Sequence, residues 1–249
     1  MAPRDAQRCL CELRRGACDG SCGRLSAADA TYVAGLRVRG RRCVVVGAGR
    51  VALGKVRGLL DCGARVAVVS PAAVEELRAL AARGAVDWRP RAYAAADVDG
   101  AFLVIAATDD VALNVGVAED AARAGALVNV VNAPALSDFI VPAVVRGGPV
   151  TLAVTTAGSS PALARRIRRE LGERYGEPLD RLSALLAEGW ARLAARADPR
   201  DARPDPRAFL SHVLDAEPDP VALLGRGDVG SVRRLLADAE DAALSRRTS

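Results

Sequence analysis

Residues 43–55 read Cys-Val-Val-Val-Gly-Ala-Gly-Arg-Val-Ala-Leu-Gly-Lys, and this stretch decides the fold of the chain. A short apolar run ends in a glycine turn, and the turn opens into a segment with helical character. Gly47 permits a tight turn, and Gly49 lets the backbone approach a pyrophosphate. The start of a helix then attracts negative charge through its N–H groups and its dipole. Ala52 stands where a small residue allows close packing of helix on strand. The stretch predicts a nucleotide-phosphate site, and a doubly wound domain that binds no nucleotide remains the alternative.

Apolar strands and amphipathic helices alternate around this turn. Strands are predicted at residues 42–46, 65–69, 86–88, 101–107 and 127–131, and helices at 51–60, 74–83 and 111–124. Gly63, Gly84 and Gly125 follow the three helices, as is typical of helix ends. This order predicts an α/β fold with a Rossmann-like doubly wound parallel sheet.

The alternation changes after Asn132. Two more strands are predicted at 139–145 and 150–155, and then a helix that Ser160 caps and Pro161 begins. Beyond Pro178 the pattern is helical, with segments at 179–195, 206–214 and 229–244 and a proline-rich loop at 197–206. The chain therefore continues from the sheet domain into a small α+β segment and a helical C-terminal part.

Composition excludes several classes of protein. The chain has 249 residues and a net charge of +5, but only 3% of its residues are aromatic, so base stacking on nucleic acid is disfavoured. No apolar stretch reaches the roughly 18 residues of a membrane span, and no signal peptide is visible, which predicts a cytoplasmic protein. Cys9, Cys11, Cys18 and Cys22 match no common zinc or iron–sulfur spacing, so a flexible tail is favoured over a metal site.

Two positions at strand ends leave alternatives open. Ser70 stands where a dinucleotide site usually carries an acid for the ribose hydroxyls, so the residues alone do not decide between NAD and NADP. Asp109 follows the strand at 101–107, where ligands sit in such sheets. It can therefore contact a ligand or cap the next helix.

Six short motifs occur in order along the chain, at residues 47–52, 63–66, 106–110, 129–134, 138–142 and 158–165. Together they resemble the precorrin-2 dehydrogenase/sirohydrochlorin ferrochelatase family, the first module of sirohaem synthase. The resemblance covers about residues 32–190. It implies oxidation of precorrin-2 to sirohydrochlorin with NAD, and many members also insert ferrous iron to give sirohaem. It also implies a homodimer held by the segment after the nucleotide domain.

The resemblance assigns the parts of the chain and the cofactor site. We expect a cysteine-containing extension at 1–30, an NAD-binding Rossmann domain at 31–138, a dimerisation segment at 139–177 and a helical domain at 178–249. The pyrophosphate is expected at Gly47, Gly49, Arg50 and Val51, the adenosine ribose at Ser70, Pro71 and Ala72, and the nicotinamide at Ala107, Thr108 and Asp109.

The substrate side is expected at the helix after residue 158. Precorrin-2 carries carboxylates around its rim, and arginine binds carboxylates with paired hydrogen bonds. Candidate substrate contacts are Thr156, Ser159, Ser160, Arg165, Arg168 and Arg169. A solvated charged helix face is the alternative for any single arginine.

One catalytic position departs from the family pattern. The family usually reads Asn-x-x-Asp where this chain has Asn129 and Asn132, and an amide cannot accept a proton at neutral pH. Asn129, Asn132 and Asp138 are the catalytic candidates, and Asp138 or Asp109 can replace the missing acid. The alternatives are a catalytically weakened protein that binds NAD and a tetrapyrrole, and an unrelated nucleotide-dependent oxidoreductase.

Overall fold

The computed structural model describes residues 32–157, 159–196 and 205–245. The chain divides into two units, of which the first spans Met1–Val141 with Ala157–Ser159 and the second spans Pro142–Thr156 with Ser160–Ser249. The predicted extension at 1–30 and most of the loop predicted at 197–206 lie outside the described residues.

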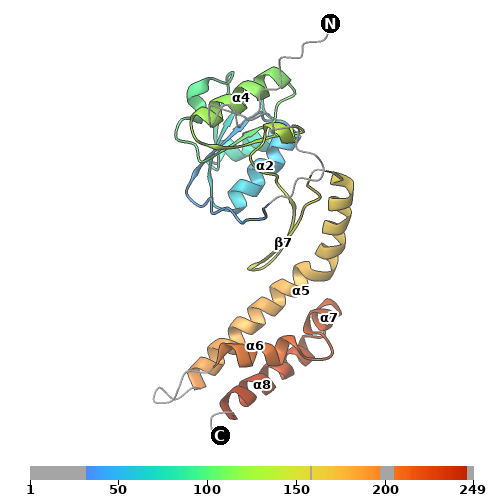
Figure 1. The fold of residues 1–249 in the computed structure, drawn as a ribbon. Coiled ribbons are helices and arrows are strands. Elements are labelled where there is room, and N and C mark those ends of the chain that lie inside the picture. The colour runs from blue at the N-terminus through green and yellow to red at the C-terminus, as the bar shows by residue number, and fades with distance from the viewer. Residues whose placement is uncertain (1–31, 158, 197–204, 246–249) are drawn as a thin grey trace. The chain divides into compact units, whose positions relative to one another are not determined.

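The first unit is built on a parallel sheet of five strands (Figure 1). The strands are β1 (Arg42–Val46), β2 (Arg65–Val69), β3 (Asp87–Arg89), β4 (Leu103–Ala106) and β5 (Leu127–Val130). They lie in the order β3-β2-β1-β4-β5. The chain leaves β1 toward β2 on one side and later returns to β4 on the other. The strand order therefore reverses between β1 and β4, where doubly wound sheets bind their ligands. The predicted fold class is confirmed.

Helices cover both faces of this sheet because its strands are apolar on both sides. The helices are α2 (Arg50–Asp61), α3 (Glu75–Ala82) and α4 (Val111–Arg123), with short 3-10 turns η1 (Ala95–Val98) and η2 (Pro134–Leu136). Val45 and its in-phase neighbours pack against α2 and α3, whereas Val44 and Val46 pack against α4. Successive strand residues point to opposite faces, so each strand contributes to two cores.

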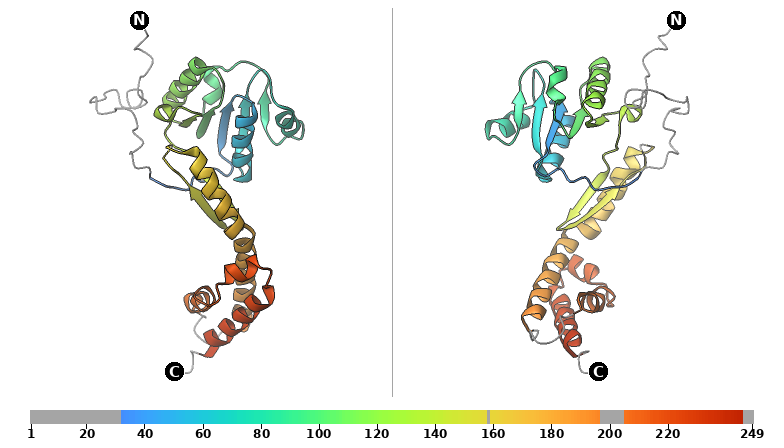
Figure 2. Two further views of the ribbon diagram at one scale, coloured as in Figure 1. Left: turned by 90° about the vertical axis from the view of Figure 1, so that its right-hand side faces the viewer. Right: turned by 60° about the vertical axis from the view of Figure 1, so that its left-hand side comes forward.

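The second unit begins with an antiparallel hairpin of β6 (Ala143–Gly147) and β7 (Val150–Val154). The strand predicted at 139–145 thus starts four residues later than expected. The hairpin packs on α5 (Pro161–Arg196) (Figure 2). A Cβ on Gly147 would lie 2.6 Å from the carbonyl oxygen of Gly176, so the strand and the helix approach closely only because Gly147 has no side chain. Helices α6 (Pro206–Leu214), α7 (Pro220–Gly225) and α8 (Val229–Ser245) complete the unit.

Helix α5 contradicts one prediction. Separate helices were expected on either side of Pro178, but one helix of 36 residues runs through that proline. An internal proline removes one backbone hydrogen bond and bends the helix, and Figure 1 shows α5 changing direction along its length. Pro178 is buried, and a Cβ on Gly225 of α7 would lie 3.8 Å from its ring. Packing against α7 therefore offsets the lost hydrogen bond. The expected domain boundary at 177/178 falls inside α5.

Candidate functional site

The glycine turn joins the carboxyl ends of β1 and β4. Gly47 has a φ of +102°, a conformation that side chains disfavour. A Cβ built on it would collide with the carbonyl oxygen of Ala107 and would lie 3.2 Å from Cγ2 of Thr108. The Ala107 N–H also donates to the carbonyl of Val46 at 2.8 Å. Gly47 is thus required for the contact between two strand ends as well as for the turn.

The start of α2 is open to an anion. Gly49 is the N-cap, with φ −81° and ψ −174°, and no side chain caps the helix. A Cβ on Gly49 would meet no atom within 4 Å, and Arg50 and Val51 are exposed. The first turn holds no acidic residue, so its N–H groups and the helix dipole remain available to a negative group. Ala52 is fully buried, which gives the close helix–sheet packing expected of the third position. These features fit a dinucleotide pyrophosphate.

The segment directly after β4, with Ala107 and Thr108, is held in place by Asn114, which the sequence analysis did not select. Asn114 of α4 is only 6% exposed, and its Oδ1 accepts hydrogen bonds from the Thr108 hydroxyl at 2.8 Å and from the Thr108 N–H at 3.3 Å. Its Nδ2 donates to the Thr108 carbonyl at 2.9 Å. Three bonds to one residue fix the segment that contains Ala107 and Thr108. The available signal was a polar residue that lies one turn before Val117 and Ala118 on the buried side of this helix.

The alternative that Asp109 caps α4 is wrong. Asp110 is the N-cap, and its Oδ1 accepts a hydrogen bond from the Leu113 N–H at 3.0 Å. Asp109 is exposed and makes no side-chain hydrogen bond or ion pair among the described residues. Its carboxylate therefore stays available at the carboxyl edge of the sheet, beside Thr108.

The segment after β2 is ordered by one internal hydrogen bond and by hydrogen bonds to β3 and to the glycine turn. The Ser70 hydroxyl donates to the Ala72 carbonyl at 2.8 Å, and the Trp88 indole donates to the Ser70 carbonyl at 3.1 Å. The Val74 N–H donates to the Ala48 carbonyl at 3.0 Å, which ties the segment to the glycine turn. Ser70 retains only acceptor capacity toward a ribose. Pro71 and Ala72 complete the exposed part of the segment.

The three catalytic candidates after β5 differ in their surroundings. Asn129 is 9% exposed, and its amide donates to the Phe139 carbonyl at 2.8 Å, which holds the returning chain. The Asp138 carboxylate accepts a hydrogen bond from the Val128 N–H at 2.8 Å, so it extends the edge of β5. Asn132 is exposed and has a φ of 62°, in the left-handed region that asparagine tolerates better than most residues. Asn132 thus presents an exposed side chain directly after the strand, and Asp138 is also exposed, six residues further on.

The substrate candidates lie just before α5 and along its first turns, with Ser159 in the first unit and the others in the second. Thr156 Oγ1 accepts a hydrogen bond from the Ser160 N–H at 3.1 Å, and Ser160 Oγ accepts one from the Leu163 N–H at 3.3 Å. The predicted cap at Ser160 is thereby confirmed. Ser159 is exposed, as are Arg165, Arg168 and Arg169.

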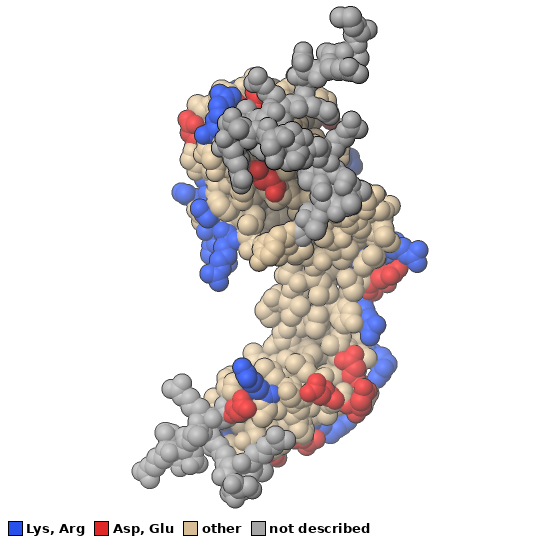
Figure 3. All heavy atoms as spheres, viewed as in Figure 1, with Lys and Arg blue, Asp and Glu red and all other residues tan. Residues whose placement is uncertain are grey.

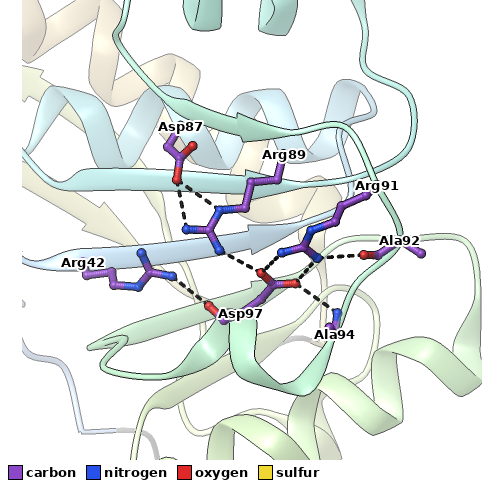
Figure 4. Close-up of polar contacts among 7 residues, drawn as sticks. All are labelled: Arg42, Asp87, Arg89, Arg91, Ala92, Ala94 and Asp97. Atoms are coloured by element: carbon purple, nitrogen blue, oxygen red, sulfur yellow. Dashed lines mark hydrogen bonds and ion pairs between the residues drawn. The ribbon is translucent and has the colours of Figure 1, made fainter.

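Asp97 of η1, in the connection from β3 to β4, is the buried centre of an ion-pair cluster with two partly exposed arginines (Figure 4). Asp97 is 1% exposed and accepts hydrogen bonds from Arg89 at 2.8 Å, from Arg91 at 2.6 and 2.7 Å, and from the Ala94 N–H at 3.0 Å. Arg42 donates to the Asp97 carbonyl at 2.9 Å. Hydrogen bonds from Arg91, from the Ala94 N–H and from Arg89 hold the pKa of Asp97 far below its usual range, although burial opposes this. The cluster fixes the β3–β4 connection, and sequence reasoning did not find it.

Other reactive residues have no evident ligand. Among the described residues no group of three or more His, Cys, Asp or Glu side chains is arranged to hold a metal, and Cys9, Cys11, Cys18 and Cys22 lie outside them. Burial raises the pKa of the Cys43 thiol to about 11, so this thiol stays protonated. Within the same residues, no helix combines the length and hydropathy of a membrane span.

Comparisons with known proteins agree with a dinucleotide-binding fold. A family described as NAD(P)-binding matches residues 34–143, and one described as the central part of a sirohaem biosynthesis protein matches residues 148–174. A solved structure titled SirC, precorrin-2 dehydrogenase, superposes with a TM-score of 0.68 at 26% identity, covering 85% of this chain and 100% of that one. The resemblance to the precorrin-2 dehydrogenase/sirohydrochlorin ferrochelatase family is confirmed.

The curated relatives that the chain matches are longer than it. A siroheme synthase from Methylococcus capsulatus is 40% identical over 84% of this chain and 43% of its own length. A siroheme synthase from Thioalkalivibrio sulfidiphilus is 40% identical over 85% of this chain and 42% of its own. The chain thus spans less than half the length of these relatives. The match to the first family identifies the first unit as an NAD(P)-binding domain.

Proposed function

We propose that this chain oxidises precorrin-2 to sirohydrochlorin with NAD, in sirohaem biosynthesis. The observation that carries the proposal is the likeness to a precorrin-2 dehydrogenase across that protein's entire length. The open start of α2 and the absence of a Cβ at Gly49 supply the matching cofactor site. In the reaction, precorrin-2 loses a hydride and a proton, and NAD when bound supplies the hydride acceptor.

The first unit has the parts to bind and orient a dinucleotide. Gly47, Gly49, Arg50 and Val51 surround the proposed pyrophosphate site, and the segment of Ser70, Pro71 and Ala72 borders the ribose. Ala107 and Thr108, held by Asn114, form the wall toward the nicotinamide. We propose NAD rather than NADP from the family resemblance. Arg78 donates from its Nε to the Ala73 carbonyl at 3.0 Å, so a guanidinium lies next to this segment. Arginine accommodates the 2′-phosphate of NADP in such folds, so the affinities of the chain for NAD and for NADP should be measured together.

The proton must leave by a route that does not use residue 132 as a base. The Asn132 amide can orient substrate or a water, but it does not accept a proton at neutral pH. Asp138 is engaged with the Val128 N–H, whereas Asp109 has no such bond. We propose that Asp109, or water beside it, takes the proton. Asn129 serves as a positioning residue through its bond to Phe139.

The second unit, together with Ser159 of the first, supplies the proposed substrate side. Thr156, Ser159 and Ser160 surround the start of α5, where the helix dipole favours carboxylates, and Arg165, Arg168 and Arg169 continue along the helix. Insertion of ferrous iron, as a substrate, is a further proposed activity that rests on the siroheme synthase relatives. It must remove two pyrrole protons, so we expect it to suffer more than dehydrogenation from the amide at Asn132.

We propose that the chain acts as a homodimer. A hairpin of two strands is marginally stable by itself, and β6–β7 forms no larger sheet in the described residues. Leu163 is 48% exposed, which leaves apolar surface on α5, the helix that packs against the hairpin. Light scattering should give twice the chain mass, and Leu163→Asp should shift it toward the monomer. A wild-type monomer at micromolar concentration would refute this assembly.

Turnover tests the proposed reaction directly. The purified chain, given precorrin-2 and NAD without oxygen, should form NADH and sirohydrochlorin in equal amounts. Adding ferrous iron to the product tests chelation separately. If a folded protein that binds NAD forms neither NADH nor sirohydrochlorin, the proposal is refuted.

The weakened-binder alternative has less support, because the likeness extends over a whole dehydrogenase. Asn132→Asp discriminates between the two. A dehydrogenase that routes its proton through Asp109 should gain little from the change and should lose activity in Asp109→Asn. A large gain in Asn132→Asp from a negligible wild-type rate would instead favour the weakened binder.

A further inference from the structure

Helix α3 carries an arginine whose two terminal nitrogens are unused. The Nε of Arg78 donates to the Ala73 carbonyl at 3.0 Å and lies 3.7 Å from the Glu75 carboxylate. Among the residues that the structure describes, the two terminal nitrogens of Arg78 make no hydrogen bond or ion pair. The side chain is 56% exposed, so a ligand can reach these nitrogens from solvent.

Arg78 lies beside the segment that is proposed to border the adenosine ribose. Helical side chains lean toward the start of their helix, and the bond to Ala73, which precedes α3, has this direction. The N–H of Val74, the N-cap of α3, donates to the Ala48 carbonyl at 3.0 Å. The start of α3 is thereby fastened to the glycine turn, where the pyrophosphate is proposed to bind.

The end of β2 lacks the acid that would exclude a phosphorylated ribose. In doubly wound dinucleotide sites a carboxylate at this place binds the ribose 2′-hydroxyl, whereas a nearby arginine accommodates a 2′-phosphate. Residues 70–74 read Ser-Pro-Ala-Ala-Val and hold no carboxylate. Glu75 follows them, but its side chain is largely exposed and lies beside Arg78. Solvent and the neighbouring guanidinium therefore weaken its repulsion of a phosphate.

Two other arginines near this end of the sheet are already paired. The Ser70 N–H donates to the Arg89 carbonyl, so the end of β3 adjoins the same segment. The side chains of Arg89 and Arg91 both bind the buried Asp97, and turning either toward a ligand would weaken that pairing. Of these three guanidinium groups, only that of Arg78 keeps both terminal nitrogens free in the described structure.

From this arrangement we propose that Arg78 binds the 2′-phosphate of NADP, so that the site accepts NADP as well as NAD. The inference rests on the proposed function, which places the adenosine ribose beside Ser70. A guanidinium pairs with a phosphate through two parallel hydrogen bonds, and the free terminal nitrogens of Arg78 can form such a pair. NAD carries a hydroxyl at this place and gains no such pair. Arg78 therefore sets the ratio of the two affinities.

Calorimetric titration of the full chain with NADP and with NAD tests the assignment without turnover. Arg78→Ala should raise the Kd for NADP roughly tenfold, about the effect of one charge-assisted hydrogen-bonded pair, and leave the Kd for NAD unchanged. Arg78→Lys should keep part of the NADP affinity, because an ammonium still attracts phosphate as a point charge. Adenosine 2′,5′-bisphosphate and adenosine 5′-monophosphate should show the same contrast, since they differ only in the 2′-phosphate.

A matched control is needed because the surface of the first unit is basic in places. Figure 3 shows basic side chains close together along one margin of this unit, and such a surface attracts any phosphate. Arg83→Ala removes the same charge from the exposed C-cap of α3, about 7.5 Å further along the helix, and should leave both affinities unchanged. Glu75→Gln removes the carboxylate beside Arg78 and should tighten NADP binding roughly twofold.

The outcomes separate this inference from the proposed reaction. A loss of NADP affinity alone in Arg78→Ala, with wild-type values in Arg83→Ala, supports it. Three results overturn it: a wild type that does not bind NADP, equal NADP affinity in wild type and Arg78→Ala, or an equal loss of NADP and NAD affinity in Arg78→Ala, as the broken bond to Ala73 alone would cause. If the chain binds NADP through Arg78 but does not oxidise precorrin-2, the reaction fails and the phosphate site stands.

Discussion

Alanine at each of the two glycines of the turn should change a different property: Gly47→Ala should lower stability, and Gly49→Ala should weaken NAD binding. In Gly47→Ala the new Cβ would meet the Ala107 carbonyl group, with its carbon only 2.8 Å away, in a backbone with φ +102°. The conformational strain costs roughly 1–2 kcal/mol and the overpacking roughly 1–3 kcal/mol. A total near 3 kcal/mol corresponds to a melting temperature lower by about 6–12 °C for a chain of this size.

In Gly49→Ala the new Cβ meets no protein atom within 4 Å, and the φ of −81° suits any residue. Stability should therefore change by less than about 1 kcal/mol. The same Cβ would occupy the approach of the pyrophosphate, so the Kd for NAD should rise at least about tenfold.

Thermal unfolding without cofactor and calorimetric titration with NAD measure the two effects separately. An unchanged melting temperature in Gly47→Ala would show that the contact between the ends of β1 and β4 carries no energy. Wild-type NAD affinity in Gly49→Ala would place the pyrophosphate away from this turn and refute the reasoning.

Three further predictions follow from side chains of the first unit. Asp97 has a depressed pKa in the folded protein, so its stabilising effect is complete above about pH 4 and declines as the pH falls further. Asp97→Asn should therefore lower the free energy of unfolding at pH 7 by about 3 kcal/mol, and denaturant titrations should show a smaller loss of stability at acid pH. Asn114→Leu should raise the KM for NAD with only a small loss of stability, because it removes the bonds that position Thr108. Asn114→Asp should keep part of the wild-type affinity for NAD, because its oxygens still accept from Thr108. Equal KM values in wild type and Asn114→Leu would contradict the positioning role. Asp110→Ala should cost about 1 kcal/mol as a lost helix cap, while Asp109→Ala should leave thermal stability unchanged, and the reverse order would reassign the cap.

Local patterns were sufficient to predict the sheet domain. The apolar runs at β1, β2, β4 and β5 are strands that are buried except at their first residues in β1, β2 and β5, and their alternation with helices admits few arrangements. The glycine turn was also predicted from a local pattern, because its glycines determine the conformation of the backbone directly beside them. The bounds of α6, at Pro206–Leu214, were also predicted correctly, because an aspartate cap and a proline mark its start.

Features that depend on contacts between distant segments were missed. Asn114 bonds to Thr108 from the next helix, and Asp97 is paired by arginines that precede it in a loop and on a strand. Neither pairing produces a periodic pattern. Pro178 was read as a helix boundary because the local rule for proline is strong. Its burial against α7 overrides that rule, and this contact depends on tertiary packing.

The continuity of α5 limits how this protein can be cut into fragments. A Cβ on Gly147 would lie 3.0 Å from Leu179, and one on Gly148 would lie 2.6 Å from the Asp180 carboxylate, so the turn of the hairpin rests on residues beyond Pro178. A fragment that ends at residue 177 would lose this support, together with the helices that bury Pro178. Fusions and truncations that preserve the hairpin should therefore keep α5 whole.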